Sequence, residues 1–251
     1  MNLFSMLLNL MFPPKCVNCG ELLEIDIMKK PVTPLCGKCR MILEKEKVKS
    51  CSECGLDMKS CRCMPKILSE AGCSVLLKLV SYKPYGNMPI RKMIFSLKHS
   101  YNKISFEFIA EQLRFLLIGE MKKRMLLPDK CVITYLARSE KNKNNEGFDQ
   151  AREIAKALAY QTGIRLSHCV KRRMFTREEK KLNSVERRLN MNSAFCVSDK
   201  NCEISGKTVI LVDDIVTTGS GMAAASELLF SAGAEDIIGL CVGYTDKNDK
   251  K

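Results

Sequence analysis

The chain has 251 residues, 46% of them hydrophobic, which suits a globular protein of one or two domains with a proper core. It contains no run of about 18 apolar residues, so we expect no membrane span. Its 41 Lys and Arg residues against 28 Asp and Glu residues give a formal charge of +13. Nucleic acid or another polyanion is therefore a candidate partner, although basic charge also suits solubility alone.

The first segment, residues 1–12, is apolar but lacks the basic start and the small-residue cleavage site of a signal peptide. We expect it to form a short helix packed on the body of the protein. Without an export signal, the chain is expected in the cytoplasm, where reducing conditions favour metal-bound cysteines over disulfides.

Eight of the fourteen cysteines lie between residues 16 and 63, mostly in C-x-x-C pairs. Each C-x-x-C makes a tight turn with converging sulfurs, and two such turns supply the four thiolates of a structural Zn²⁺ site. A second set ends in C-x-C, so one shared zinc with crossed pairing, or a decayed second site, is an alternative to two zincs. The predicted ligands are Cys16, Cys19, Cys36 and Cys39 for the first site, and Cys51, Cys54, Cys61 and Cys63 for the second.

Two such sites would change the charge, because eight thiolates around two Zn²⁺ ions carry a net charge of −4 and lower the total from +13 to +9. The other six cysteines are scattered along the chain, and we expect them to be buried as small apolar side chains. They are Cys73, Cys131, Cys169, Cys196, Cys202 and Cys241.

After Pro65 the cysteine density drops, which places a domain boundary there and divides the chain into residues 1–64 and 65–251. Apolar runs then predict buried strands over residues 74–82, 131–136, 206–212 and 236–242. Apolar residues at helical spacing predict helices around residues 106–117 and 148–158. Between the last helix and the third strand lies a basic tract, Lys171 to Arg188, which is a candidate polyanion site or else a solvated helix.

The most informative stretch begins with the predicted strand that ends at Val212. Two adjacent carboxylates follow, then a loop of hydroxyl and glycine residues, and then a helix with Met222 and Leu229 on its apolar face. A loop that opens a helix beyond the end of a strand directs free backbone N–H groups at one spot, which suits a phosphate. The two acids can accept hydrogen bonds from paired sugar hydroxyls, so the stretch predicts a ribose 5-phosphate site. A chance acidic pair in an unrelated α/β fold is the alternative.

This stretch resembles the PRPP-binding motif of type I phosphoribosyltransferases. The resemblance implies that the acids hold the ribose 2′ and 3′ hydroxyls, that the loop holds the 5′-phosphate, and that Mg²⁺ accompanies PRPP. The family usually has Ser, Thr, Ala or Arg where this chain has Gly221. The implied ligand-binding residues are Asp213, Asp214, Ile215, Val216, Thr217, Thr218, Gly219, Ser220 and Gly221.

The whole chain resembles the ComF family of bacterial competence proteins, because an apolar start, Pro13-Pro14-Lys15-Cys16 and two cysteine sets precede the phosphoribosyltransferase motif. The resemblance implies an α/β fold: a mostly parallel phosphoribosyltransferase-like sheet flanked by helices and preceded by a small double zinc ribbon. It also implies that Lys98 and Arg138 approach pyrophosphate or another anion. Glu146 stands where relatives carry an arginine, which weakens the case for full transferase chemistry.

Three functions follow from these features. The first is a ComF-type protein that binds PRPP or a related nucleotide and handles single-stranded DNA during natural transformation, with a competence helicase as a further partner. The second is an active phosphoribosyltransferase that transfers phosphoribosyl from PRPP to a nucleobase, although no base-recognition or catalytic residue can be named. The third is a scaffold with a vestigial ligand site.

Overall fold

The computed structural model describes residues 11–23, 33–58, 60–82, 88–99, 101–137, 148–172, 195–198 and 202–245. Three segments discussed above lie outside these ranges: the apolar start up to residue 10, the predicted anion loop 138–147, and residues 173–188 of the basic tract. In the part of the chain that is described, no helix is both long and apolar enough to cross a membrane.

Five parallel strands form the central sheet, in the order β1-β7-β6-β2-β3. The predicted mostly parallel sheet is therefore confirmed. The strand ends differ from the predicted limits by at most two residues in either direction, except that β6 runs four residues past its predicted end. Their bounds are β1 Cys73–Ser81, β2 Cys131–Tyr135, β3 Arg165–Leu166, β6 Thr208–Val216 and β7 Asp236–Tyr244.

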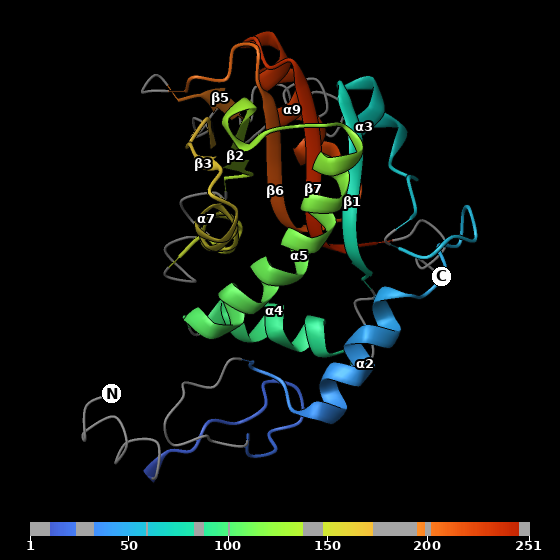
Figure 1. Cartoon of the computed structure of the whole chain (residues 1–251), viewed down its shortest axis with the longest axis vertical. Coiled ribbons are helices and arrows are strands. Elements are labelled where there is room, and N and C mark those ends of the chain that lie inside the picture. The colour runs from blue at the N-terminus through green and yellow to red at the C-terminus, as the bar shows by residue number, and fades with distance from the viewer. Residues whose placement is uncertain are drawn as a thin grey trace, which may run out of the picture.

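Helices cover both faces of this sheet. One face packs against α4 (Pro89–His99), α5 (Lys103–Lys123) and α7 (Gln150–Thr162), and α5 crosses in front of the strands in Figure 1. The other face packs against α3 (Lys66–Glu70) and α9 (Ser220–Ser231). Burial on both sides explains why the strands are nearly continuous apolar runs.

Alternation along β6 shows how one strand serves two cores. Ile210 and Val212 join the core under α5 and α7, whereas Val209 and Leu211 join the core under α9. Helix α7 begins at a capping residue, because the Asp149 carboxylate accepts a hydrogen bond from the Arg152 N–H. A short 3₁₀ turn, η1 (Pro128–Lys130), leads into β2.

A separate antiparallel pair, β4 (Val170–Arg172) and β5 (Phe195–Val197), borders the basic tract. Next to it, Cys169 and Cys202 form a disulfide that closes a separation of 33 residues. The expectation that all six scattered cysteines are single apolar side chains is therefore wrong for these two. The chain brings their Cα atoms within 5.2 Å of each other, close enough for a bond that their spacing does not reveal.

The cysteine-rich segment packs against one side of the sheet domain. Its helix α2 (Gly37–Lys47) contacts α4 and β1, and Figure 1 shows it below the sheet next to α4. Leu43 of α2 is fully buried in the same core as α4 and α5. The segment therefore contributes to the core under α5 as well as holding its own cysteines.

Candidate functional site

The acid pair lies at the point where β2 stops and β6 continues. Tyr135, the last residue of β2, is level with Val212, whereas β6 runs on to Val216 alongside β7. The prediction that the strand ends before the acids is therefore wrong, because pairing with β7 extends it through both of them. Asp213 and Asp214 still stand beyond the carboxyl end of β2, which is the edge where ligands bind in open α/β sheets.

Backbone hydrogen bonds orient the two carboxylates. Asp213 accepts from the Asp214 N–H at 2.9 Å, and Asp214 accepts from the Ile215 N–H at 2.8 Å. Asp214 is buried, while Asp213 is half-buried. An ionised carboxylate has about four acceptor sites, so each acid retains capacity to accept hydrogen bonds from sugar hydroxyls.

The loop from Thr217 to Gly221 forms the turn into α9. Gly219 is the N-cap residue with a left-handed φ of 78°, and no side chain caps the helix from this position. The Thr218 and Ser220 hydroxyl oxygens lie 3.0 Å apart, both on the open side of the turn. Backbone N–H groups at the positive end of the helix dipole and two adjacent hydroxyls suit a phosphate.

Gly221 marks the departure from the phosphoribosyltransferase pattern, and its surroundings show what a side chain would meet. A Cβ atom at this position would lie 3.3 Å from Cδ2 of Leu136. A side chain here would therefore require Leu136 to move by a few tenths of an ångström. The position of Leu136, directly after β2, thus favours a glycine at position 221 of the loop.

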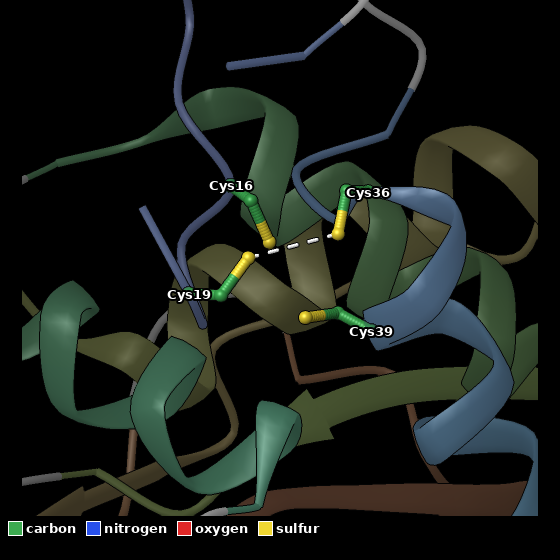
Figure 2. Close-up of side chains that lie close together, drawn as sticks. All are labelled: Cys16, Cys19, Cys36 and Cys39. Carbon is green, nitrogen blue, oxygen red and sulfur yellow. Dashed lines mark hydrogen bonds between the residues drawn. The ribbon is translucent and has the colours of Figure 1, made fainter. Parts of the chain in front are cut away.

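The first four-cysteine cluster comprises Cys16, Cys19, Cys36 and Cys39, whose sulfurs all lie within 4.8 Å of one another. Figure 2 shows the four side chains pointing toward a common centre, with Cys39 on helix α2. The sulfurs of Cys19 and Cys36 are 3.7 Å apart. This matches the edge of about 3.8 Å in a tetrahedron of sulfurs around Zn²⁺ at about 2.3 Å.

The second cluster comprises Cys51, Cys54, Cys61 and Cys63, and its sulfurs meet the same distance criterion. Those of Cys54 and Cys61 are 3.6 Å apart. Closing the set with C-x-C therefore preserves the convergence of four sulfurs. Two separate clusters disfavour the alternative of a single zinc with crossed pairing, and both donor sets fit structural Zn²⁺.

Both clusters open with the same turn. The Gly20 N–H donates to the Cys16 carbonyl at 2.8 Å, and the Gly55 N–H donates to the Cys51 carbonyl at 2.9 Å. Each glycine has a positive φ, 76° and 73° respectively, which only glycine adopts readily. The Cys-x-x-Cys-Gly spacing in the sequence thus defines a repeated local structure.

Backbone hydrogen bonds increase the acidity of one thiol in the first cluster, Cys16, whereas burial raises the pKa of Cys39 to about 12. Burial raises the pKa of the Cys16 thiol, but hydrogen bonds from the backbone of Cys19, Cys36 and Asn18 outweigh burial and lower the pKa to about 7. Deprotonation at neutral pH favours metal binding, since the thiolate is the ligand.

Two buried polar side chains adjacent to the clusters are not identified by the motifs. Asn18 donates a hydrogen bond through Nδ2 to Cys39 Sγ at 3.2 Å, and the Lys78 ammonium donates to Cys61 Sγ at 3.1 Å. Hydrogen bonds to ligand sulfurs hold them in place and tune a metal site. Lys78 left a signal in the sequence, because it is the one charge inside the apolar run Cys73–Ser81.

A chain of charged side chains runs from the second cluster to the start of β7. Arg62 and Arg124 both donate to the buried Glu120 carboxylate, at 2.6 and 2.7 Å, and Arg124 also contacts Asp236 at 2.7 Å. Burial raises the pKa of Glu120, but the two arginines outweigh burial and hold the pKa below its usual range. This network connects Arg62, which lies between two cysteines of the second cluster, to helix α5.

The two predicted anion contacts are not placed in the site. Arg138 lies outside the described residues, and Lys98 is in α4 but its side chain is not described. The described site therefore consists of the acid pair, the loop that opens α9 and the two cysteine clusters.

The phosphoribosyl transferase domain family matches residues 130–251, which include β2, β6 and the loop that opens α9. In solved structures, the chain is similar to a purine phosphoribosyltransferase from Pyrococcus horikoshii, with 18% identity and a TM-score of 0.33 over 55% of this chain and 73% of that one. The family match places a phosphoribosyltransferase domain in the C-terminal half of the chain.

Relatives extend the similarity to the cysteine-rich segment. The DNA utilization protein YhgH of Escherichia coli K12 is 28% identical over 237 residues, which cover 85% of this chain and 98% of that protein. Competence protein F of Haemophilus influenzae is 35% identical over 92 residues, which cover 36% of this chain and only 40% of that protein. The chain thus carries two four-cysteine clusters ahead of a phosphoribosyltransferase domain and is similar over most of its length to YhgH, in line with its resemblance to the ComF family.

Proposed function

We propose that this protein binds PRPP, or a related ribose 5-phosphate ligand, with Mg²⁺ at the carboxyl end of β6, and that it acts in the uptake of single-stranded DNA during natural transformation. The observation that carries the ligand is the pairing of two oriented carboxylates with a hydroxyl-lined helix start. The names of the relatives, competence protein and DNA utilization protein, support the role in DNA handling.

The charges of the site residues indicate which part of the ligand each of them binds. Asp213 and Asp214 repel phosphate, so they suit the ribose hydroxyls, which donate hydrogen bonds to carboxylates. The Thr217 to Gly221 loop at the positive end of α9 suits the 5′-phosphate. A ligand that carries a diol beside a phosphate satisfies both halves at once, whereas a free phosphate or a free sugar satisfies only one.

Calorimetric titration of PRPP with Mg²⁺ into zinc-replete protein tests the ligand. We expect wild-type binding that is lost, by at least about tenfold in affinity, in the Asp213→Asn/Asp214→Asn double variant, because neutral amides replace the charged acceptors. Asp129→Asn is the matched control, since Asp129 is exposed in η1 at the opposite end of β2. Absence of PRPP binding to the wild type would refute this assignment.

Turnover separates the proposed role from that of an active phosphoribosyltransferase. Pyrophosphate released from PRPP in the presence of mixed nucleobases would establish the enzyme. Binding without release would support a ligand-controlled DNA-handling protein.

DNA handling has its own test. We expect single-stranded DNA to bind in a salt-sensitive manner, because contacts between cationic side chains and phosphates release counterions. Lys171→Gln/Arg172→Gln, at the exposed start of the basic tract, should weaken binding and reduce its salt dependence. Affinity that is independent of both salt and these residues would count against the basic tract as the DNA contact.

A further inference from the structure

Lys78 of β1 is 1% exposed, although it carries an ammonium group. Its Nζ donates hydrogen bonds to Cys61 Sγ at 3.1 Å and to the carbonyl of Cys63, and it lies 4.7 Å from the centre of the Tyr244 ring. A buried ammonium is strongly unfavourable unless anionic or polar partners replace water. Four thiolates around Zn²⁺ carry a net charge of −2, so the ammonium and the second cluster stabilise each other.

The same lysine belongs to a row of residues that crosses the sheet to the acid pair. Lys78 on β1 is level with Cys241 on β7, and Cys241 is level with Asp213 on β6. Side chains at the same level on adjacent strands project to the same face and pack against one another. Cys241 between them is fully buried, so the row contains no gap filled by solvent.

A second connection runs from the cluster to the loop that opens α9. Pro65 follows the last ligand, Cys63, by two residues, and Leu68 is fully buried in α3. A Cβ atom at Gly219 would lie 3.1 Å from Pro65 Cγ and 3.1 Å from Leu68 Cδ1. The backbone of the loop therefore rests directly on the segment that the second cluster anchors.

The first cluster is attached elsewhere. Lys92, an exposed residue of α4, donates a hydrogen bond to the carbonyl of Asn18 at 2.8 Å. The first cluster thus contacts α4 and, through helix α2, also β1, whereas a lysine of β1 bonds directly to a sulfur of the second cluster, and the segment after that cluster contacts the loop that opens α9.

We propose that the second cysteine cluster supports the ribose-phosphate site, with Lys78 as the positioning residue that couples them, so that zinc occupancy at this cluster sets the affinity of the site for its ligand. This regulation rests on the proposed function. It assigns different roles to the two clusters: the second controls the ligand site, and the first does not.

Hydrogen exchange of the backbone amides of residues 217–223, measured without ligand, tests the coupling directly. Lys78→Met keeps the apolar stem and removes the ammonium, and we expect the loop amides to exchange at least about tenfold faster, because the cluster no longer holds the segment beneath Gly219. Lys92→Met is the matched control, a lysine that contacts the first cluster, and should leave loop exchange within twofold of wild type. Unchanged loop exchange in Lys78→Met would overturn the proposal.

Zinc and ligand are then followed in the same variants. In Lys78→Met we expect one of two zinc equivalents to pass faster to a chromophoric chelator, since loss of a residue that bonds a metal ligand lowers metal affinity by about 10–100-fold. Because the second cluster then supports the loop less well, we expect ribose 5-phosphate to bind about tenfold more weakly. The Cys51→Ser/Cys54→Ser variant, which lacks two ligands of the second cluster, should show the same weakening. Full ligand affinity in this variant would also overturn the proposal.

A second pair of variants covers the case in which Lys78→Met fails to fold. Leu68→Ala removes the side chain beneath Gly219, while Ile67→Ala removes a partly exposed neighbour on the same helix. Faster loop exchange in Leu68→Ala alone supports the coupling, and equal exchange in both refutes it. If the wild type binds neither PRPP nor ribose 5-phosphate, the proposed function fails, and loop exchange still decides whether the cluster supports the loop.

Discussion

The turns Cys16–Gly20 and Cys51–Gly55 have the same hydrogen bond and the same left-handed glycine, yet the two clusters finish differently. The first is completed at the start of α2, with Asn18 as its polar neighbour. The second is completed by a C-x-C pair, with a lysine from the central sheet as its neighbour. The same local motif can therefore bond to its own segment or to a strand of the sheet, depending on which side chain bonds its sulfurs.

The largest expected difference between the clusters is in global stability. Cys51→Ser/Cys54→Ser should lower the free energy of unfolding by about 3–5 kcal/mol more than Cys16→Ser/Cys19→Ser, because it leaves the buried Lys78 ammonium without its anionic partner. Urea unfolding of both double variants measures this difference. Equal losses would show that the two clusters are equivalent and that the contrast drawn here is wrong.

We expect the free energy of unfolding to depend on pH through Glu46, which lies on the same helix as Cys39 of the first cluster. Glu46 of α2 is 5% exposed, and no described residue bonds its buried Oε2 atom. Burial raises the pKa of this carboxyl to about 7, although Lys49 acts in the opposite direction. The folded protein therefore holds this proton more tightly than the unfolded chain, and stability contributed by protonation is lost as pH rises from about 4.5 to about 7.

Glu46→Gln should remove this loss. We expect the variant to be more stable than wild type by about 1–3 kcal/mol at pH 8 and nearly equal to it at pH 4, measured by urea unfolding across that range. Glu227→Gln, an exposed position on α9, is the control and should change stability by less than about 0.5 kcal/mol at any pH. A constant offset between Glu46→Gln and wild type would contradict the raised pKa.

Local spacing accounts for what the sequence predicts well. The C-x-x-C pairs converge within one turn, and the apolar run before Asp213 predicts a buried strand. These features depend on residues within a few positions of each other. For the same reason, the cysteine clusters and the strand were predictable from local sequence, whereas the fold class followed from the resemblance to a known family.

Contacts between distant segments account for what the sequence does not reveal. Pairing with β7 carries β6 through the acids to Val216, and that pairing is set by the whole sheet. Cys169 meets Cys202 across 33 residues, and Lys78 meets Cys61 across 17. A lysine in an apolar strand indicates a buried partner, but nothing in the spacing identifies that partner as a zinc ligand.

The smallest expected effect isolates the amide that bonds the first cluster. Asn18→Ala removes the hydrogen bond to Cys39 Sγ, so we expect about 1 kcal/mol lower stability and about tenfold faster release of one zinc equivalent to a chelator. Asn102→Ala is the matched control, because this residue caps α5 and should lower stability by a similar amount of about 1 kcal/mol without changing zinc release. Equal zinc release in both variants would mean that Asn18 only stabilises the turn. Faster release in Asn18→Ala with unchanged exchange of the 217–223 amides would show that the first cluster can loosen its metal without disturbing the ligand loop, which separates it from the second cluster.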